Sequence, residues 1–179
     1  MARVARRAAA LRGFPPVSRR DARVLVLGSM PGAASLRRGQ YYAYRHNSFW
    51  PIVGALLGLP PTASYAARTR ALRRRRIALW DVLASCLREG SADAAIRDAA
   101  INDFPAFFAR HPEVTHVYFN GATAERWFLA HAAPRLASRR LRYARLPSTS
   151  PAHASLSVAR KRAAWRVILG PLRDGGARE

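Results

Sequence analysis

Four short apolar segments, each followed by a loop, are the feature that most constrains the fold of this chain. The segments lie at residues 24–27, 77–80, 114–119 and 141–145. Segments with helical patterns separate them, at residues 48–57, 92–100, 104–110, 122–132 and 158–169, and an arginine-rich connection at 60–76 has room for a further short helix. Short strands that alternate with helices are typical of a parallel sheet covered on both faces. We therefore expect an α/β fold, with a three-layer α/β/α arrangement around a central four-stranded parallel sheet.

The length of the chain suits one domain. With 179 residues, half of them apolar, the chain can bury a core of ordinary size. We expect a basic, flexible N-terminal arm at residues 1–20, a single domain at 21–172 and a C-terminal tail at 173–179. Residues 1–12 contain arginine and alanine without an apolar stretch, so a secretory signal is not expected, although an amphipathic targeting peptide has a similar composition.

The formal net charge of +21 indicates a polyanionic partner. Lys161 is the only lysine, so nearly all of this charge comes from arginine, whose guanidinium group binds phosphate oxygens in a bidentate way. The codons of a GC-rich genome also favour arginine and alanine, and they account for part of the excess. Because few acidic residues offset the charge, we expect nucleic acid as the partner, ahead of an acidic membrane surface.

Several other features narrow the class of protein. Cys86 is the only cysteine, so the chain can form neither an intramolecular disulfide nor a cysteine-ligated iron–sulfur cluster. The longest apolar runs are far below the roughly 18 residues of a membrane span. The five histidines lack the spacing of metal ligands. We expect a soluble, cytoplasmic monomer that binds no membrane, no metal and no cofactor.

Four distinctive loop sequences each follow one of the expected strands. They are GSMPG at residues 28–32, WD at 80–81, FNG at 119–121 and LPSTSPAHA at 146–154. Open parallel sheets bind their ligands at the carboxyl ends of the strands, so these loops are expected to line one cleft. Taken alone, GSMPG favours a structural turn, because no Gly-Lys-Ser/Thr of a phosphate-binding loop follows it.

Longer strings around these loops resemble the uracil-DNA glycosylase superfamily. The strings are LGSMPGAASLRRGQYYAYRHNSFWPIVGALLG, ALWDVLASC, VYFNGATAE and LPSTSPAHA, and the resemblance spans residues 25–165. Within the superfamily, the resemblance is to the hypoxanthine (deoxyinosine) DNA glycosylase branch, which is related to the mismatch-specific uracil/thymine DNA glycosylases. It implies a monofunctional enzyme that flips deaminated bases, hypoxanthine and/or uracil, out of DNA and hydrolyses the N-glycosidic bond to leave an abasic site. DNA containing deaminated bases is then the partner.

Asn47 and His153 are the catalytic candidates. In the mismatch-specific relatives, an Asn in the loop equivalent to GSMPG positions the attacking water, and this chain has Ser29 and Met30 there. The resemblance implies that Asn47 of HNSFWP takes this role, while a helix N-cap is the alternative for this residue. His153 is a candidate for stabilising charge near the sugar, for contacting a phosphate, or for a simple surface position. Asp81 is either a water-activating base or a helix cap.

A flipped base is held by stacking and by hydrogen bonds to its edge. The residues expected to provide these contacts are Gly28, Ser29, Met30, Pro31, Gly32, Tyr42, Phe49 and Asn120. Asn120 can read the edge of a deaminated base or can simply form a strand-end turn, and the aromatic residues can belong to the core. The loop LPSTSPAHA at residues 146–154, here called the serine-rich loop, resembles the family segment that enters the minor groove. This resemblance implies DNA contacts by Ser148, Thr149, Ser150, Pro151 and Ala152.

Two other functions fit parts of the sequence. A non-catalytic basic nucleic-acid-binding protein would use the charge alone and has no need of Asn47 and Asn120 beside a pocket. A small α/β hydrolase could use Ser150 and His153, but the chain shows neither a third orienting group for them nor the G-x-S-x-G elbow.

Overall fold

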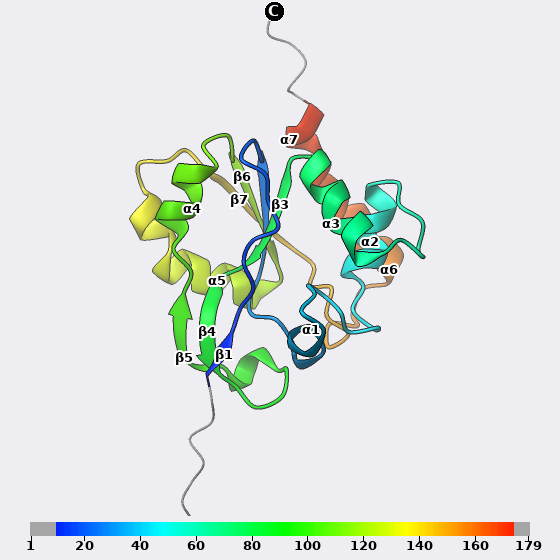
Figure 1. Ribbon diagram of the computed structural model, residues 1–179, viewed down its shortest axis with the longest axis horizontal. Helices are drawn as coiled ribbons and strands as arrows, with labels where there is room; N and C mark the ends of the chain where they lie inside the picture. The colour runs from blue at the N-terminus through cyan, green and yellow to red at the C-terminus, as the bar shows by residue number, and fades with distance from the viewer. Residues whose placement is uncertain (1–9, 174–179) are drawn as a thin grey trace, which may run out of the picture.

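The centre of the molecule is a parallel sheet of four strands in the order β3-β2-β6-β7 (Figure 1). The computed structural model describes residues 10–173. Its central strands are Val24–Gly28 (β2), Ile77–Asp81 (β3), His116–Asn120 (β6) and Arg142–Leu146 (β7). Every residue of β2 and β3 is buried, as expected where helices cover both faces of a sheet. The predicted four-stranded parallel sheet is confirmed.

Helices lie on both sides of this sheet (Figure 1). One side carries α2 (Phe49–Leu56), α3 (Tyr65–Arg74) and α6 (Val158–Trp165), and the other carries α4 (Phe104–Arg110) and α5 (Ala122–His131). The shorter helices are α1 (Ala33–Arg38), η2 (Ala133–Leu136), η3 (Arg166–Leu169) and α7 (Gly170–Arg173). The α/β/α arrangement expected from the sequence is therefore confirmed.

A second, antiparallel sheet was not expected. It consists of β1 (Leu11–Arg12), β4 (Leu83–Leu87) and β5 (Arg97–Ile101) in the order β1-β4-β5. The helix predicted at residues 92–100 is wrong, because only a single 3-10 turn, η1 (Asp93–Ala95), precedes β5. The alanines of this segment favour a helix locally, but the backbone groups of β4 need partners, and pairing with β5 supplies them.

Residues 10–20, which we expected in a flexible arm, pack against the domain. Val17 exchanges both backbone hydrogen bonds with Leu79, each 2.9 Å long, and the Phe14 carbonyl accepts a hydrogen bond from Trp80 Nε1 at 2.9 Å. The reason for this correction is that β3 is an edge strand of the main sheet, and its outer backbone groups need partners. Residues 1–9 of the expected arm and residues 174–179 of the expected tail lie outside the described residues.

None of the helices between residues 10 and 173 combines the length and the apolar character needed to cross a membrane.

Candidate active site

A pocket of about 750 Å³ opens at the carboxyl edge of the main sheet. Strand register brings the loops there, because Gly28 of β2 lies opposite Asp81 of β3, and Asn120 of β6 lies opposite Leu146 of β7. The sequence-predicted residues that line the pocket are Gly28, Ser29, Met30, Pro31, Gly32, Tyr42, Asn47, Asn120, Ser148, Thr149, Ser150, Pro151, Ala152 and His153. The size is within the usual range for pockets that bind small ligands. Each of the four loops expected to line one cleft contributes residues to this pocket.

Gly28 allows the first loop to approach the neighbouring strand closely. A Cβ atom on this residue would clash with Asp81 Oδ1 and would lie 2.8 Å from Tyr42 Oη. Glycine is therefore required here by space, since any side chain would displace two polar groups of the pocket wall. The next residue, Ser29, donates its hydroxyl hydrogen to Asp93 Oδ1 at 2.8 Å, and this bond connects the loop to η1.

Tyr42 provides an aromatic wall of the pocket. Its ring stacks on the ring of Phe49 with a centroid distance of 3.9 Å and an interplanar angle of 14°. Phe49 is only 1% exposed and does not line the pocket itself, so its predicted contact with a base is replaced by support of Tyr42 from behind. Tyr42 has a backbone φ of 54°, in the left-handed region that costs a non-glycine residue about 1–3 kcal/mol. The surrounding contacts thus hold this ring at an energetic cost, as is common at binding sites.

Asn120 joins three loops through its side-chain amide. Its Nδ2 donates to Tyr42 Oη at 3.0 Å and to Thr149 Oγ1 at 2.9 Å, while its Oδ1 accepts from the Thr149 backbone N–H at 2.9 Å. Both amide hydrogens are therefore used within the protein. The group that Asn120 can still offer to a ligand is the second lone pair of Oδ1. The following residue, Gly121, has φ of 92° and lets Ser148 approach within 3.0 Å of where a Cβ would stand.

Thr149 is an anchor of the serine-rich loop. It is 1% exposed. Its carbonyl accepts two hydrogen bonds from Ser48, one from the backbone N–H at 3.0 Å and one from the Ser48 hydroxyl at 3.1 Å. Thr149 thus has little surface for a phosphate, which corrects its predicted DNA contact. Pro151, Ala152 and His153 are exposed at the rim of the pocket.

Asn47 is fixed at the start of α2. Its Oδ1 accepts a hydrogen bond from the Phe49 backbone N–H at 2.9 Å, so the side chain does act at the helix terminus. Its Nδ2 has no hydrogen-bond partner within residues 10–173, and the residue lines the pocket. The two roles considered from the sequence are therefore compatible, because the amide oxygen and the amide nitrogen serve different partners.

Lys161 of α6 supports the serine-rich loop through a hydrogen bond to its backbone. Its side chain is only 5% exposed, and Nζ donates to the His153 carbonyl at 2.6 Å. Burial lowers the pKa of this amine. Trp165, one turn further along α6, donates from Nε1 to the Pro147 carbonyl at 2.9 Å. Two buried side chains of one helix thus hold the ends of the loop.

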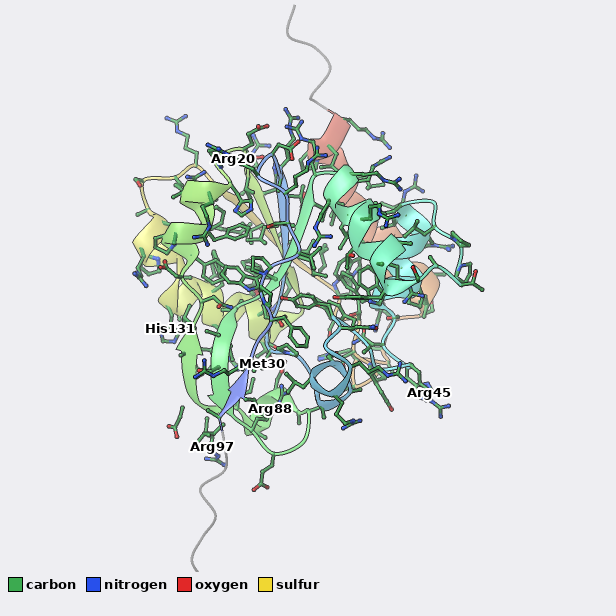
Figure 2. All side chains as sticks on the ribbon, viewed as in Figure 1. Arg20, Met30, Arg45, Arg88, Arg97 and His131 are labelled. Carbon is green, nitrogen blue, oxygen red and sulfur yellow. The ribbon has the colours of Figure 1, made fainter. Side chains whose placement is uncertain are left out.

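Asp81 is a buried carboxylic acid in the wall of the pocket. It is 3% exposed, and its Oδ2 has no hydrogen-bond partner in the described part of the chain. Burial, together with the nearby carboxylate of Asp93, raises the pKa of Asp81 to about 7, although the Arg88 guanidinium opposes the shift. Arg88 is also buried and donates to the Pro31 carbonyl beneath the GSMPG loop. Its position in the molecule is marked in Figure 2.

Sequence reasoning missed the connection between β4 and β5. Its residues Ser91, Ala92, Asp93 and Ala94 line the pocket. Ser91 Oγ accepts a hydrogen bond from the Ala33 backbone N–H at 2.9 Å. This contribution was missed because the sequence pattern predicts a helix at residues 92–100. Tyr44 was also missed: it lines the pocket, and its side chain is 49% exposed at the rim. Within residues 10–173, no group of three or more His, Cys, Asp or Glu residues is arranged to hold a metal ion.

The surface outside the pocket is dominated by arginine. Figure 2 shows guanidinium groups projecting around the whole periphery, with Arg45 on the loop that leads from α1 to α2. Among residues 10–173, the arginines in salt bridges to carboxylates are Arg19, Arg23, Arg76 and Arg145. The chain has 10 acidic residues against 31 basic ones, so most of its arginines cannot be paired in this way. A polyanion could approach this molecule from several directions.

Comparison with known proteins defines the class to which this fold and site belong. The model of the uracil DNA glycosylase superfamily matches residues 15–169. The chain belongs to this superfamily and is a DNA glycosylase, with DNA as its substrate, and the resemblance seen in the sequence is confirmed.

Two curated relatives are similar over much of the chain. The hypoxanthine DNA glycosylase of Methanosarcina barkeri is 41% identical over 110 residues, which are 61% of this chain and 70% of the relative. The hypoxanthine DNA glycosylase of Methanosarcina acetivorans is 35% identical over 158 residues, which are 88% of this chain and 96% of the relative. A solution NMR structure of a Methanosarcina acetivorans protein, provisionally named a uracil DNA glycosylase, superimposes with a TM-score of 0.74 at 34% identity, covering 89% of this chain and 99% of that one.

Proposed function

We propose that this DNA glycosylase flips hypoxanthine out of DNA and hydrolyses its N-glycosidic bond, leaving an abasic site. The observation that supports this most directly is the pocket at the carboxyl edge, where Asn47, Tyr42 and Asn120 line one space together with the loop at 148–153. Similarity to two hypoxanthine DNA glycosylases supports the choice of base. Uracil is the second candidate, because it shares a ring N–H next to a keto group with hypoxanthine.

Recognition of the base is assigned to the carbonyl oxygen of Asn120. Both amide hydrogens of this residue are used by Tyr42 and Thr149, so the available group is an acceptor. Hypoxanthine presents N1–H as a donor, whereas adenine presents an unprotonated N1 that would face the same oxygen with a lone pair. An unpaired buried polar group costs about 1–3 kcal/mol, which corresponds to roughly tenfold to a hundredfold discrimination. Tyr42 supplies the stacking surface.

The attacking water is assigned to Asn47. Its Oδ1 is held by the Phe49 backbone N–H, which fixes the plane of the amide and directs Nδ2 to donate to a water. An amide orients water but does not remove its proton at neutral pH. The reaction is therefore one in which loss of the base leads, and water adds to the cationic C1′ that forms. His153, at the rim of the pocket, is assigned to stabilising the positive charge that develops on the sugar.

Strand cleavage by the enzyme itself is not expected. A lyase needs an amine that attacks C1′ to form a Schiff base. Lys161 is the only lysine, and its buried Nζ is hydrogen-bonded to the His153 carbonyl. This arrangement supports simple hydrolysis that leaves an intact abasic site.

One assay tests the proposal. The protein is incubated with labelled duplexes that contain inosine, uracil, xanthine or a mismatched thymine, and half of each sample is then treated with hot alkali. We expect cleavage at inosine after alkali and intact strands without it. Strand breaks without alkali, trapped by borohydride, would contradict the monofunctional assignment, and faster removal of uracil than of hypoxanthine would reverse the choice of base.

A further inference from the structure

The carboxyl group of Asp81 has no role in the mechanism above, although it lies in the wall of the same pocket. It stands at the carboxyl end of β3, directly opposite Gly28 of β2. The absence of a side chain on Gly28 leaves the Asp81 carboxyl next to the pocket, since any Cβ there would occupy the space beside Oδ1. Oδ2 has no hydrogen-bond partner among residues 10–173. A buried polar group without a partner is costly and calls for an explanation, and a catalytic role is one of the explanations that apply to such groups.

The surroundings favour the protonated form of this carboxyl. The titratable and charged groups that face it are Tyr41 and Tyr42 from the loop after α1, Arg88 after β4 and Asp93 in η1. Desolvation and the like charge of Asp93 outweigh the opposite charge of Arg88, which is why the pKa of Asp81 is raised to about 7. At neutral pH a large fraction of the molecules therefore carries a proton at this position.

Expulsion of a purine creates a need for such a proton. When the N9–C1′ bond breaks, the bonding electron pair stays on the base, and the ring becomes anionic unless it is protonated. N7 is the imidazole nitrogen of the nucleoside that remains free to accept a proton. General acid catalysis at a leaving group contributes a factor of about 10²–10⁴ to the rate, and it is most effective when the pKa of the acid is close to the working pH.

We propose that Asp81 is the general acid of the reaction, whose carboxyl proton passes to N7 of hypoxanthine as the N9–C1′ bond breaks. The proposal rests on the glycosylase function proposed above. The base leaves as neutral hypoxanthine, water adds to C1′ and its excess proton passes to solvent, and the Asp81 carboxylate takes up a proton from solvent before the next turnover. The balance is one water consumed, with one free base and one abasic site formed.

The other titratable groups of the pocket are less suited to this step. Asp93 already accepts the Ser29 hydroxyl hydrogen, and the guanidinium of Arg37 does not release its proton in a protein. Burial raises the pKa of Tyr41 and of Tyr42, so both rings hold their protons too strongly. His153 is exposed at the rim of the pocket, whereas Asp81 is buried in its wall.

The variant Asp81→Asn tests the proposal, with Asp103→Asn as the matched control. Asp103 caps α4 by accepting a hydrogen bond from the Ala106 backbone N–H, a role that asparagine fulfils equally well, and it lies outside the pocket. Single-turnover excision of hypoxanthine is measured between pH 5.5 and 9. We expect the wild-type rate to fall above pH 7. Asp81→Asn should be about 10²–10⁴-fold slower, and its rate should not fall above pH 7. Asp103→Asn should have the rate and the pH dependence of the wild type.

A substrate containing 7-deazahypoxanthine tests the same step without any substitution in the protein. This base has carbon in place of N7, so the wild type should cleave it slowly and without the fall above pH 7, and Asp81→Asn should not slow it further. Two results would overturn the assignment of Asp81. One is a rate and pH profile of Asp81→Asn equal to those of the wild type on hypoxanthine. The other is an Asp81→Asn variant that is slowed as strongly on the deaza substrate as on hypoxanthine. Absence of hypoxanthine excision by the wild type would instead overturn the proposed function.

Discussion

In the proposed mechanism, Asn47 is the residue on which the hydrolytic step depends most. Replacement by alanine removes the amide nitrogen that is available to water, and it also removes the acceptor for the Phe49 backbone N–H. Loss of one catalytic hydrogen-bonding group commonly costs a factor of about 10²–10³ in rate. Asn47→Ala should therefore lose most single-turnover activity on inosine DNA while its affinity for that DNA changes little.

A helix-capping contribution is separated from this effect by Asn47→Asp. Aspartate keeps the acceptor for the Phe49 N–H but lacks the amide N–H, so it should restore stability without restoring the rate. Near wild-type rates for Asn47→Ala would assign the positioning of water to another residue.

The raised pKa of Asp81 is also expected to make the stability of the fold depend on pH. Its pKa is raised from the value of 3.8 expected in an unfolded chain to about 7 in the folded protein. Below pH 3.8 both states hold the proton, and as the pH rises towards 7 only the unfolded state releases it, so this residue makes the fold progressively less stable. The full effect above pH 7 is on the order of 4 kcal/mol, at 1.36 kcal/mol for each pKa unit.

Asp81→Asn removes this dependence. The difference in unfolding free energy between the variant and the wild type should increase in favour of the variant from pH 4 to pH 8, as measured by urea unfolding at each pH. A difference that is constant over this range would show that the carboxyl titrates as in the unfolded chain.

Among the elements, the loop at residues 146–154 is held by buried contacts at its base and exposed at its tip. Thr149→Val keeps the shape of the side chain but removes the acceptor for Asn120 Nδ2. The unpaired N–H should cost about 1–3 kcal/mol in unfolding free energy, and looser positioning of Tyr42 and Asn120 should lower the excision rate. The control Thr62→Val, at an exposed position, should change stability by less than about 0.5 kcal/mol. Equal stability of both variants would indicate that the Thr149 hydroxyl does not help to anchor the loop.

The elements also show which parts of the structure sequence patterns reveal. Runs such as Val24–Leu27 and Ile77–Trp80 predict buried parallel strands, because both faces of such a strand are apolar. β5 could not be predicted this way, since its alanines favour a helix and only pairing with β4 decides its structure. The candidate site was likewise predictable only in part. The strand ends predicted which loops meet, but the bonds from Asn120 to Tyr42 and Thr149 span 78 and 29 residues and depend on the finished fold.

For the whole molecule, the excess of arginine predicts binding that is sensitive to salt. Each DNA phosphate that is neutralised should contribute about −0.9 to the slope of log K against log salt concentration. Fluorescence anisotropy with undamaged duplex, measured between 50 and 200 mM salt, should give a steep negative slope. Affinity that does not change over this range would show that the basic surface is not used for DNA.

The N-terminal segment covers part of the open edge of the main sheet, and we expect this cover to limit self-association. Val17 exchanges two backbone hydrogen bonds with Leu79 on the outer side of β3, and a chain shortened to begin at Ser18 would present that strand as an open template for another copy. Such a chain should form soluble oligomers or precipitate, as seen by light scattering, whereas one beginning at Ala10 should remain dispersed. If both shortened chains scatter alike, the segment has no such role. The choice of where to place a tag or a cleavage site on this enzyme is therefore a choice about its colloidal behaviour.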